Sequence, residues 1–144
     1  MYNELSVSFI GKAENVNLAR TITTAFLVDL NLKLSEVNEI KTIVSEAVTN
    51  AIVHGYLNDS SKYVDLKLKY DLYNIYIELI YKGVGIEDIE KAKEPLYSSK
   101  IEDERAGLGF TIMEVFTDSL DVISKLGEGP RILMVKKIHD QSEH

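Results

Sequence analysis

The stretch SEVNEIKTIVSEAVTNAIVHG (residues 35–55) decides the fold, because its apolar residues recur at three- and four-residue spacing. This pattern predicts one long helix that begins with Ser35 as its N-cap and stops at Gly55. The apolar stripe of this helix consists of Val37, Ile40, Ile43, Val44, Ala47, Val48, Ala51 and Ile52. The helix therefore has one face for a hydrophobic core and another for polar side chains.

Glu46 and Asn50 form the first candidate site. They lie four residues apart, so a helix places them one above the other on the same face. A carboxylate and a carboxamide stacked in this way can hold a metal ion or orient a water or a hydroxyl group. The same spacing also occurs on solvated helix faces, so the pair alone leaves both interpretations open.

The composition indicates one soluble domain. At 144 residues, 45% of them apolar and 27% charged, the chain is long enough for a hydrophobic core. The net charge of −7 argues against general binding to nucleic acid or anionic membranes and favours a protein partner with a basic surface. The chain has no cysteine, which excludes disulfides and thiolate metal sites.

The sequence gives no sign of a membrane or secretory protein. No apolar run approaches membrane-spanning length, and the first residues, MYNELSVSF, lack the basic and then apolar pattern of a signal peptide. We therefore expect a cytoplasmic protein.

The remaining periodic stretches predict strands and helices in one order. Alternating apolar residues predict a strand at residues 5–9 and a hairpin over residues 64–79. Helical spacing predicts helices over residues 14–30 and 108–116. Residues 120–138 are expected to form a closing hairpin.

The order of these elements predicts an α+β fold, a two-layer α/β sandwich with helices on one face of a mixed, largely antiparallel sheet. Residues 87–106 show little periodicity and are expected to be a lid or a mobile loop. We expect a single domain over residues 1–138, followed by a polar tail at residues 139–144.

The glycines mark a second group of candidate residues. Six of the eight fall into three G-x-G pairs, Gly83/Gly85, Gly107/Gly109 and Gly127/Gly129. Gly107-Leu108-Gly109 precedes an apolar helix and is a candidate phosphate cradle, because helix N-termini present free N–H groups. Arg105 can add a charge-assisted contact to a terminal phosphate. The last pair is most simply a tight hairpin turn.

Four segments together carry a more specific pattern. They are EIKTIVSEAVTNAIVHGY (39–56), KGVGI (82–86), EPLYSSK (94–100) and ERAGLGFTIMEVF (104–116). In order and spacing they resemble the anti-sigma-F factors of spore-forming bacteria, a family of anti-sigma serine kinases within the GHKL ATPase superfamily. The resemblance covers nearly the whole chain.

This resemblance implies both a fold and a function. The fold would be the Bergerat-type sandwich of histidine-kinase-like ATPases, which binds ATP and Mg²⁺ between the helices and a lid. The function would be that of a homodimer that holds a sporulation sigma factor inactive. The same protein would phosphorylate a serine of a small anti-anti-sigma protein.

The resemblance also implies roles for individual residues. Glu46 would be the general base for the substrate serine, and Asn50 would be the Mg²⁺ ligand. Arg20 matches a position that contacts protein partners. The cofactor-binding positions would be Gly83 and Gly85 beside the adenine, and the phosphate box Arg105, Gly107, Leu108 and Gly109.

Two positions depart from the family pattern. Tyr81 stands where the family has an aspartate that accepts a hydrogen bond from the adenine amino group, and Pro130 stands where it has a threonine. The loss of each polar partner of a recognised group such as adenine weakens the binding free energy by about 1–3 kcal/mol. Either the pocket has rearranged and still binds ATP, or the chain is a non-catalytic sigma-binding module with weakened nucleotide binding.

Overall fold

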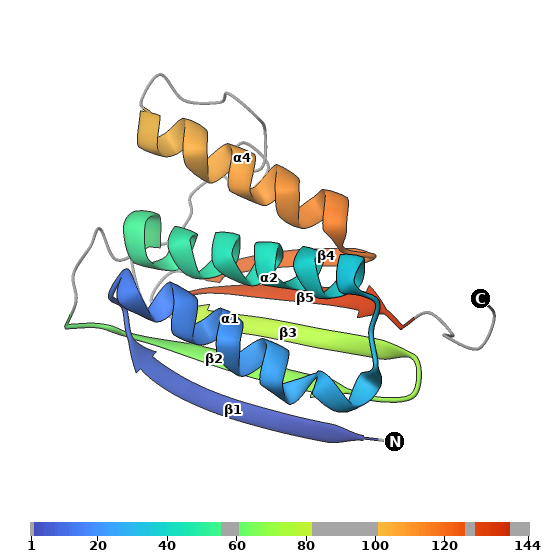
Figure 1. Ribbon diagram of the computed structural model, residues 1–144. Coiled ribbons are helices and arrows are strands. Elements are labelled where there is room, and N and C mark those ends of the chain that lie inside the picture. Colours follow the sequence, from blue (N-terminus) through green and yellow to red (C-terminus); the bar gives the residue numbers. More distant parts are fainter. Residues whose placement is uncertain (1, 56–60, 82–100, 126–128, 139–144) are drawn as a thin grey trace.

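A sheet covered by helices on one face makes up the two layers of the structure (Figure 1). The computed structural model describes residues 2–55, 61–81, 101–125 and 129–138. The strands are β1 (Asn3–Ile10), β2 (Tyr63–Tyr70), β3 (Asn74–Tyr81), β4 (Ser119–Lys125) and β5 (Gly129–Lys137). The helices are α1 (Glu14–Phe26), α2 (Leu34–Thr49) and α4 (Ile101–Phe116), with a 3-10 turn at Val28–Leu30 and a π-helical turn at Asn50–Gly55.

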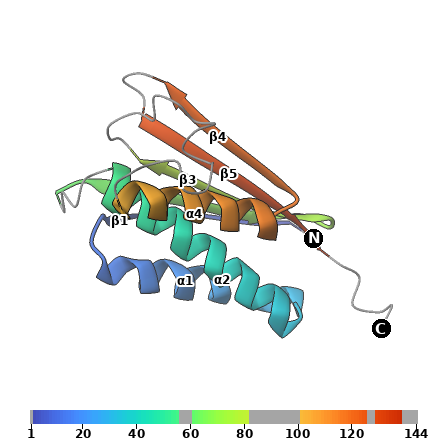
Figure 2. The ribbon, with the colours of Figure 1, turned by 90° about the horizontal axis from the view of Figure 1, so that it is seen from above.

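The five strands form one sheet in the order β1-β2-β3-β5-β4. Every pairing among them is antiparallel, so the described sheet is not mixed as expected, but the α+β sandwich is confirmed. Figure 2 shows α2 lying between α1 and α4 above this sheet. The sequence stretch that decides the fold therefore occupies the centre of the helical layer.

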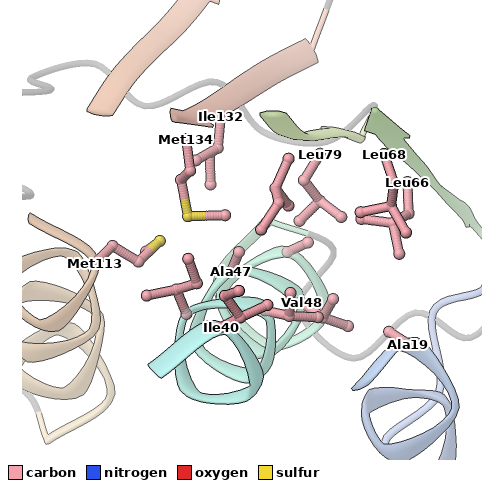
Figure 3. Close-up of a cluster of buried hydrophobic side chains, with 14 of the residues drawn as sticks. Ala19, Ile40, Ala47, Val48, Leu66, Leu68, Leu79, Met113, Ile132 and Met134 are labelled. Atoms are coloured by element: carbon pink, nitrogen blue, oxygen red, sulfur yellow. The ribbon is translucent and has the colours of Figure 1, made fainter. Parts of the chain in front are cut away.

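The core lies between α2 and the central strands. Ile43, Ala47 and Val48 of α2 have no exposed surface, and Leu66 and Leu79 face them from paired positions on β2 and β3. Figure 3 shows these apolar side chains meeting Met113 of α4 on one side and Ala19 of α1 on the other. Helix α2 thus packs against both neighbouring helices and the sheet, and together they form a single core.

The ends of two helices differ from the expectation. Ser35 is not the N-cap, because α2 begins at Leu34 with Lys33 in the capping position. The Glu36 carboxylate accepts a hydrogen bond of 3.4 Å from the Lys33 N–H, so the acidic residue of the first turn satisfies this backbone donor. Helix α1 ends at Phe26 instead of about residue 30, and a left-handed residue, Asn31 with φ of 51°, closes the turn that follows.

Helix α4 begins at Ile101, seven residues before the predicted start at residue 108. The predicted lid over residues 87–106 is therefore partly helical, and its residues 87–100 lie outside the described residues. The charged segment IEDERA (101–106) is rich in good helix formers, and their propensity outweighs the two glycines that follow. Gly107-Leu108-Gly109 consequently lies inside a helix and does not present a helix N-terminus.

A largely buried lysine contacts the other end of α4. Lys136 of β5, whose side chain is 11% exposed, lies with its Nζ 2.6 Å from Glu39 Oε2 on α2. The same Nζ donates a 2.9 Å hydrogen bond to the Phe116 carbonyl at the last residue of α4. A cation at this position also complements the negative end of the helix dipole. The sheet, α2 and α4 are therefore joined at one point.

Among the helices described, none is long and apolar enough to span a membrane.

Candidate functional site

Glu46 and Asn50 lie together at the end of α2. Glu46 belongs to its last α-helical turn, and Asn50 is the first residue of the π-helical turn that continues it. Wider turns of this kind occur often at functional sites. Asn50 is 3% exposed and Glu46 is half-buried, so the pair lies at the boundary of the core and the surface.

Gly109 of α4 lies directly against this pair. A methyl group at residue 109 would lie 3.0 Å from Glu46 Oε2, 3.0 Å from Asn50 Nδ2 and 3.3 Å from Asn50 Oδ1. Both side chains therefore point toward the same point on α4, which confirms that they share one helix face. The two helices approach so closely here that a side chain at residue 109 would push against both Glu46 and Asn50.

The Asn50 amide has an unsatisfied donor. Its Nδ2 atom is buried and has no hydrogen-bond partner in the described part of the protein. A buried donor without a partner costs about 1–3 kcal/mol, so a group of this kind in a folded protein calls for an explanation. Rotating the amide by half a turn would place its oxygen at this position instead. The amide is thus able to offer either a donor or an acceptor to a bound group.

The donor atoms of this pair fit a magnesium ion. Mg²⁺ prefers oxygen ligands, and nucleotide sites commonly supply one or two of them from the protein while phosphate and water supply the rest. Asn50 Oδ1 and the Glu46 carboxylate are oxygens of this kind. Across the described ranges no three Asp, Glu, His or Cys side chains cluster to form a metal site from protein ligands alone. A metal held here would therefore take most of its ligands from a bound nucleotide and water.

Burial sets the proton affinity of Glu46. Loss of solvent around its carboxyl group raises the pKa of Glu46 above the ordinary value, because burial disfavours the charged form. A carboxylate with a raised pKa is a stronger proton acceptor once it is ionised. The environment of Glu46 therefore suits a general base.

Tyr81 and Pro130 lie side by side at one end of the sheet. Tyr81 is the last residue of β3 and is 2% exposed within the core, so its ring does not swing out. The register of β3 and β5 pairs Ile80 with Arg131, and the next position brings Tyr81 opposite Pro130. Pro130 is also buried, and both residues face the helices. The two departures from the family pattern are therefore neighbours.

Arg20, another predicted site residue, is not brought to this pair. Arg20 lies on α1, which Figure 2 shows on the opposite side of α2 from α4, and it donates a 2.8 Å hydrogen bond to Asn17 Oδ1. Arg105 and Gly107 belong to the first part of α4, and Leu108 is 44% exposed. Gly83 and Gly85 lie outside the described residues.

Comparison with known proteins identifies the family. Residues 9–136 match the family model described as a histidine kinase-like ATPase domain. An anti-sigma F factor of Clostridium perfringens (strain SM101 / Type A) is 47% identical over 139 residues, which cover 96% of this chain and 99% of the relative. The chain belongs to the anti-sigma F factor family. Another member, from Clostridium beijerinckii, is 43% identical over 137 residues, which cover 95% of this chain and 96% of that protein.

A solved structure shares the fold of this anti-sigma F factor family member. The structure of the RsbU and RsbW domains of Rv1364c from Mycobacterium tuberculosis superimposes with a TM-score of 0.64. Its sequence identity is 18%, and the match covers 94% of this chain and 32% of that chain. At this identity the likeness concerns the fold alone, and it agrees with the predicted sandwich.

Family membership confirms the resemblance in the sequence. The sequence analysis nevertheless missed two features of the site. The π-helical turn at Asn50–Gly55 has no signal in the apolar spacing, because Ala51 and Ile52 fit an ordinary helix equally well. The contact of Gly109 with Glu46 and Asn50 was also missed, since we expected this glycine to contact phosphate. A glycine within a helical pattern was the one available sign of a close approach.

We predict that Gly109→Ala destabilises the protein by up to about 2 kcal/mol. Alanine favours a helix over glycine by about 1 kcal/mol, but overpacking a close contact costs about 1–3 kcal/mol. Glu46 is partly exposed and can move aside, whereas Asn50 is buried and cannot. Chemical denaturation of the parent and the variant measures the difference.

The Asn50→Ala background is the matched control for this prediction. Removing the amide opens space for the new methyl group, so Gly109→Ala should cost less there by about 0.5 kcal/mol or more. A Gly109→Ala protein that is more stable than the parent in both backgrounds would contradict the proposed contact.

We predict that Glu46→Gln changes how stability depends on pH. Because the folded protein binds a proton at Glu46 more tightly than the unfolded chain does, stability falls as pH rises from the ordinary value of 4.5 through the raised pKa. Glutamine removes this loss. Glu46→Gln should therefore raise the melting temperature relative to the parent at pH 7, and the gain should shrink toward pH 4.

Glu14→Gln, which removes an exposed carboxylate at the start of α1, is the control for the pH series. Its melting temperature at pH 7 should not rise above that of the parent, because Glu14 is exposed and its replacement removes no buried charge. If Glu46→Gln raised the melting temperature equally at pH 4 and pH 7, burial of the Glu46 charge would not be the cause of the increase.

Proposed function

We propose that this protein is a sporulation anti-sigma factor that is also an ATP-dependent protein serine kinase. It binds a sporulation sigma factor and phosphorylates a serine of an anti-anti-sigma protein, using ATP and Mg²⁺. It acts as a homodimer in the cytoplasm. The relatives named anti-sigma F factors support the sigma-binding half of this proposal. The match to an ATPase domain supports the kinase half.

The unsatisfied Asn50 amide beside Glu46 is the observation that carries the kinase half. A bound Mg²⁺ would neutralise charge on the phosphates of ATP, and Asn50 would hold it through its side-chain oxygen. The absence of a side chain at Gly109 lets α4 approach this amide closely. Arg105 would add a positive charge beside the terminal phosphate.

Glu46 would act on the substrate serine. Its half-buried carboxylate would accept a hydrogen bond from the serine hydroxyl and orient the serine oxygen for attack. The serine oxygen would form a bond to the terminal phosphorus of ATP as the bond to the ADP oxygen breaks and ADP leaves, and the hydroxyl proton would pass to the Glu46 carboxylate, whose raised pKa favours this transfer. Catalysis is then mainly positioning and charge stabilisation.

A second candidate is a sigma-binding module that does not turn over ATP. The packing of Tyr81 in the core, opposite the position of Pro130, favours it, because these residues replace the two polar groups that would recognise adenine. The sigma factor would then be bound through Arg20 and its surroundings without control by nucleotide.

Labelled ATP distinguishes the two candidates. We predict that the parent chain transfers labelled phosphate to a purified anti-anti-sigma protein and that Glu46→Gln lowers the rate by about 10²–10⁴-fold. ATP affinity should change little in this variant, since Glu46 acts on the serine. The exposed-carboxylate variant Glu14→Gln should retain the parental rate.

Two results would count against the kinase. If the parent binds a sporulation sigma factor in a pull-down but transfers no phosphate, the non-catalytic module is correct. If Glu46→Gln transfers phosphate at the parental rate, Glu46 is not the base.

A further inference from the structure

A lysine occupies a position of β5 that faces the helices and that would ordinarily be apolar. Ile132 and Met134, the two preceding residues on the same face of this strand, are buried core residues. Lys136 follows them on this face and pairs with the buried Ile75 of β3. An ammonium group in such a place costs free energy unless polar or charged partners surround it. The partners of Lys136 are therefore informative about its role.

Two helices supply the partners of the Lys136 ammonium group. Its Nζ lies 2.6 Å from Glu39 Oε2 on α2 and donates a 2.9 Å hydrogen bond to the Phe116 carbonyl at the last residue of α4. Hydrogen bonds from an ionised donor are shorter and about twice as strong as those between neutral groups. We call this contact of Lys136 with Glu39 and Phe116 the lysine joint.

The lysine joint lies two helical turns from the candidate site along both helices. On α2, Glu39 precedes Glu46 by seven residues. On α4, Phe116 follows Gly109 by seven residues, and Figure 1 shows that the two helices run in opposite directions. Seven residues rise about 10 Å and return to the same face of a helix. The packed faces of α2 and α4 therefore meet at two places, with Gly109 at one end and the lysine joint at the other.

The apolar contacts between these two places fix the position of α4 along its axis less sharply. Ile43 of α2 and Met113 of α4 lie midway between them and have no exposed surface. Apolar burial is non-directional, and packed helices can slide past each other by small amounts. A hydrogen bond weakens steeply when its distance or angle changes. The lysine joint therefore resists a slide of α4 along α2 that the apolar side chains would tolerate.

We infer that Lys136 is a positioning residue that sets where α4 lies over Glu46 and Asn50. With its last residue held, the rest of the helix is held too, and Gly109 stays against this pair. The first half of α4 includes Arg105, which would contact the terminal phosphate under the proposed function. Lys136 acts through α4 and touches no substrate. The inference rests on the proposed function only for the ligand that binds beside α4.

Lys136→Met tests this role, because methionine keeps an unbranched side chain and removes the ammonium group. Hydrogen exchange of the nucleotide-free protein should become at least about tenfold faster for the α4 amides. Exchange in α1 should not change, because Figure 2 shows α1 on the other side of α2 from α4. Mass spectrometry of peptides from the two helices measures both rates.

Glu39→Ala and Lys41→Met are the matched variants. Glu39→Ala should also speed exchange in α4, but it should add little in the Lys136→Met background, because both residues act in one contact. Lys41 is an exposed lysine of α2, so Lys41→Met should exchange as the parent does.

Calorimetric titration of ATP with Mg²⁺ connects α4 to the site. It is done at a temperature at which circular dichroism shows every variant to be folded. Lys136→Met should weaken ATP binding about tenfold, whereas Lys41→Met should bind as the parent does. A lysine that only stabilises the fold would lower the melting temperature and leave both ATP binding and the ratio of α4 to α1 exchange unchanged. That result would overturn the inference, as would a full Glu39→Ala effect in the Lys136→Met background.

The two measurements separate this inference from the proposed function. If the parent binds no ATP but Lys136→Met speeds exchange in α4 alone, the nucleotide site fails and the positioning of α4 by Lys136 stands. If the parent binds ATP and Lys136→Met binds it equally well, the positioning role is wrong and the nucleotide site stands.

Discussion

The close contact between α4 and the end of α2 is the constraint on which the site depends. A methyl group at Gly109 would lie 3.0 Å from both Glu46 Oε2 and Asn50 Nδ2, so a larger residue here would displace these side chains. At this contact Asn50 is buried with one amide donor unsatisfied, and burial raises the pKa of the Glu46 carboxyl group. The packing of the two helices and the unusual environment of this pair therefore occur at the same place.

Much of the architecture was predictable because it follows from local periodicity. The alternation in β1, β2 and β3 and the apolar spacing in α1 and α2 each fix which side of an element is buried. The start of α4 was not predictable from apolar spacing, because four of the six residues 101–106 are charged and their helix propensity is the one sequence signal for a helix there. The fully antiparallel strand order depends on contacts between distant segments, which no local pattern encodes.

The site was predictable in part for the same reason. Two residues four apart on a helix must share a face, so spacing alone predicted that Glu46 and Asn50 lie together, whereas the family resemblance suggested their roles. The approach of Gly109 comes from another helix about 60 residues later in the chain and required the structure. Tyr81 and Pro130 were recognised from the sequence as two separate departures. Their adjacency across β3 and β5 shows that they change one small region together.

Calorimetric titration of ATP with Mg²⁺ tests the central claim that Asn50 and Glu46 belong to a working nucleotide site. The titration compares the parent chain, Asn50→Ala, and a double variant that carries Tyr81→Asp and Pro130→Thr. Our account predicts that the parent and the double variant both bind, and that Asn50→Ala weakens binding at least about tenfold when Mg²⁺ is present. Binding by the double variant alone would contradict it, because the chain as it stands would then lack a functional nucleotide pocket.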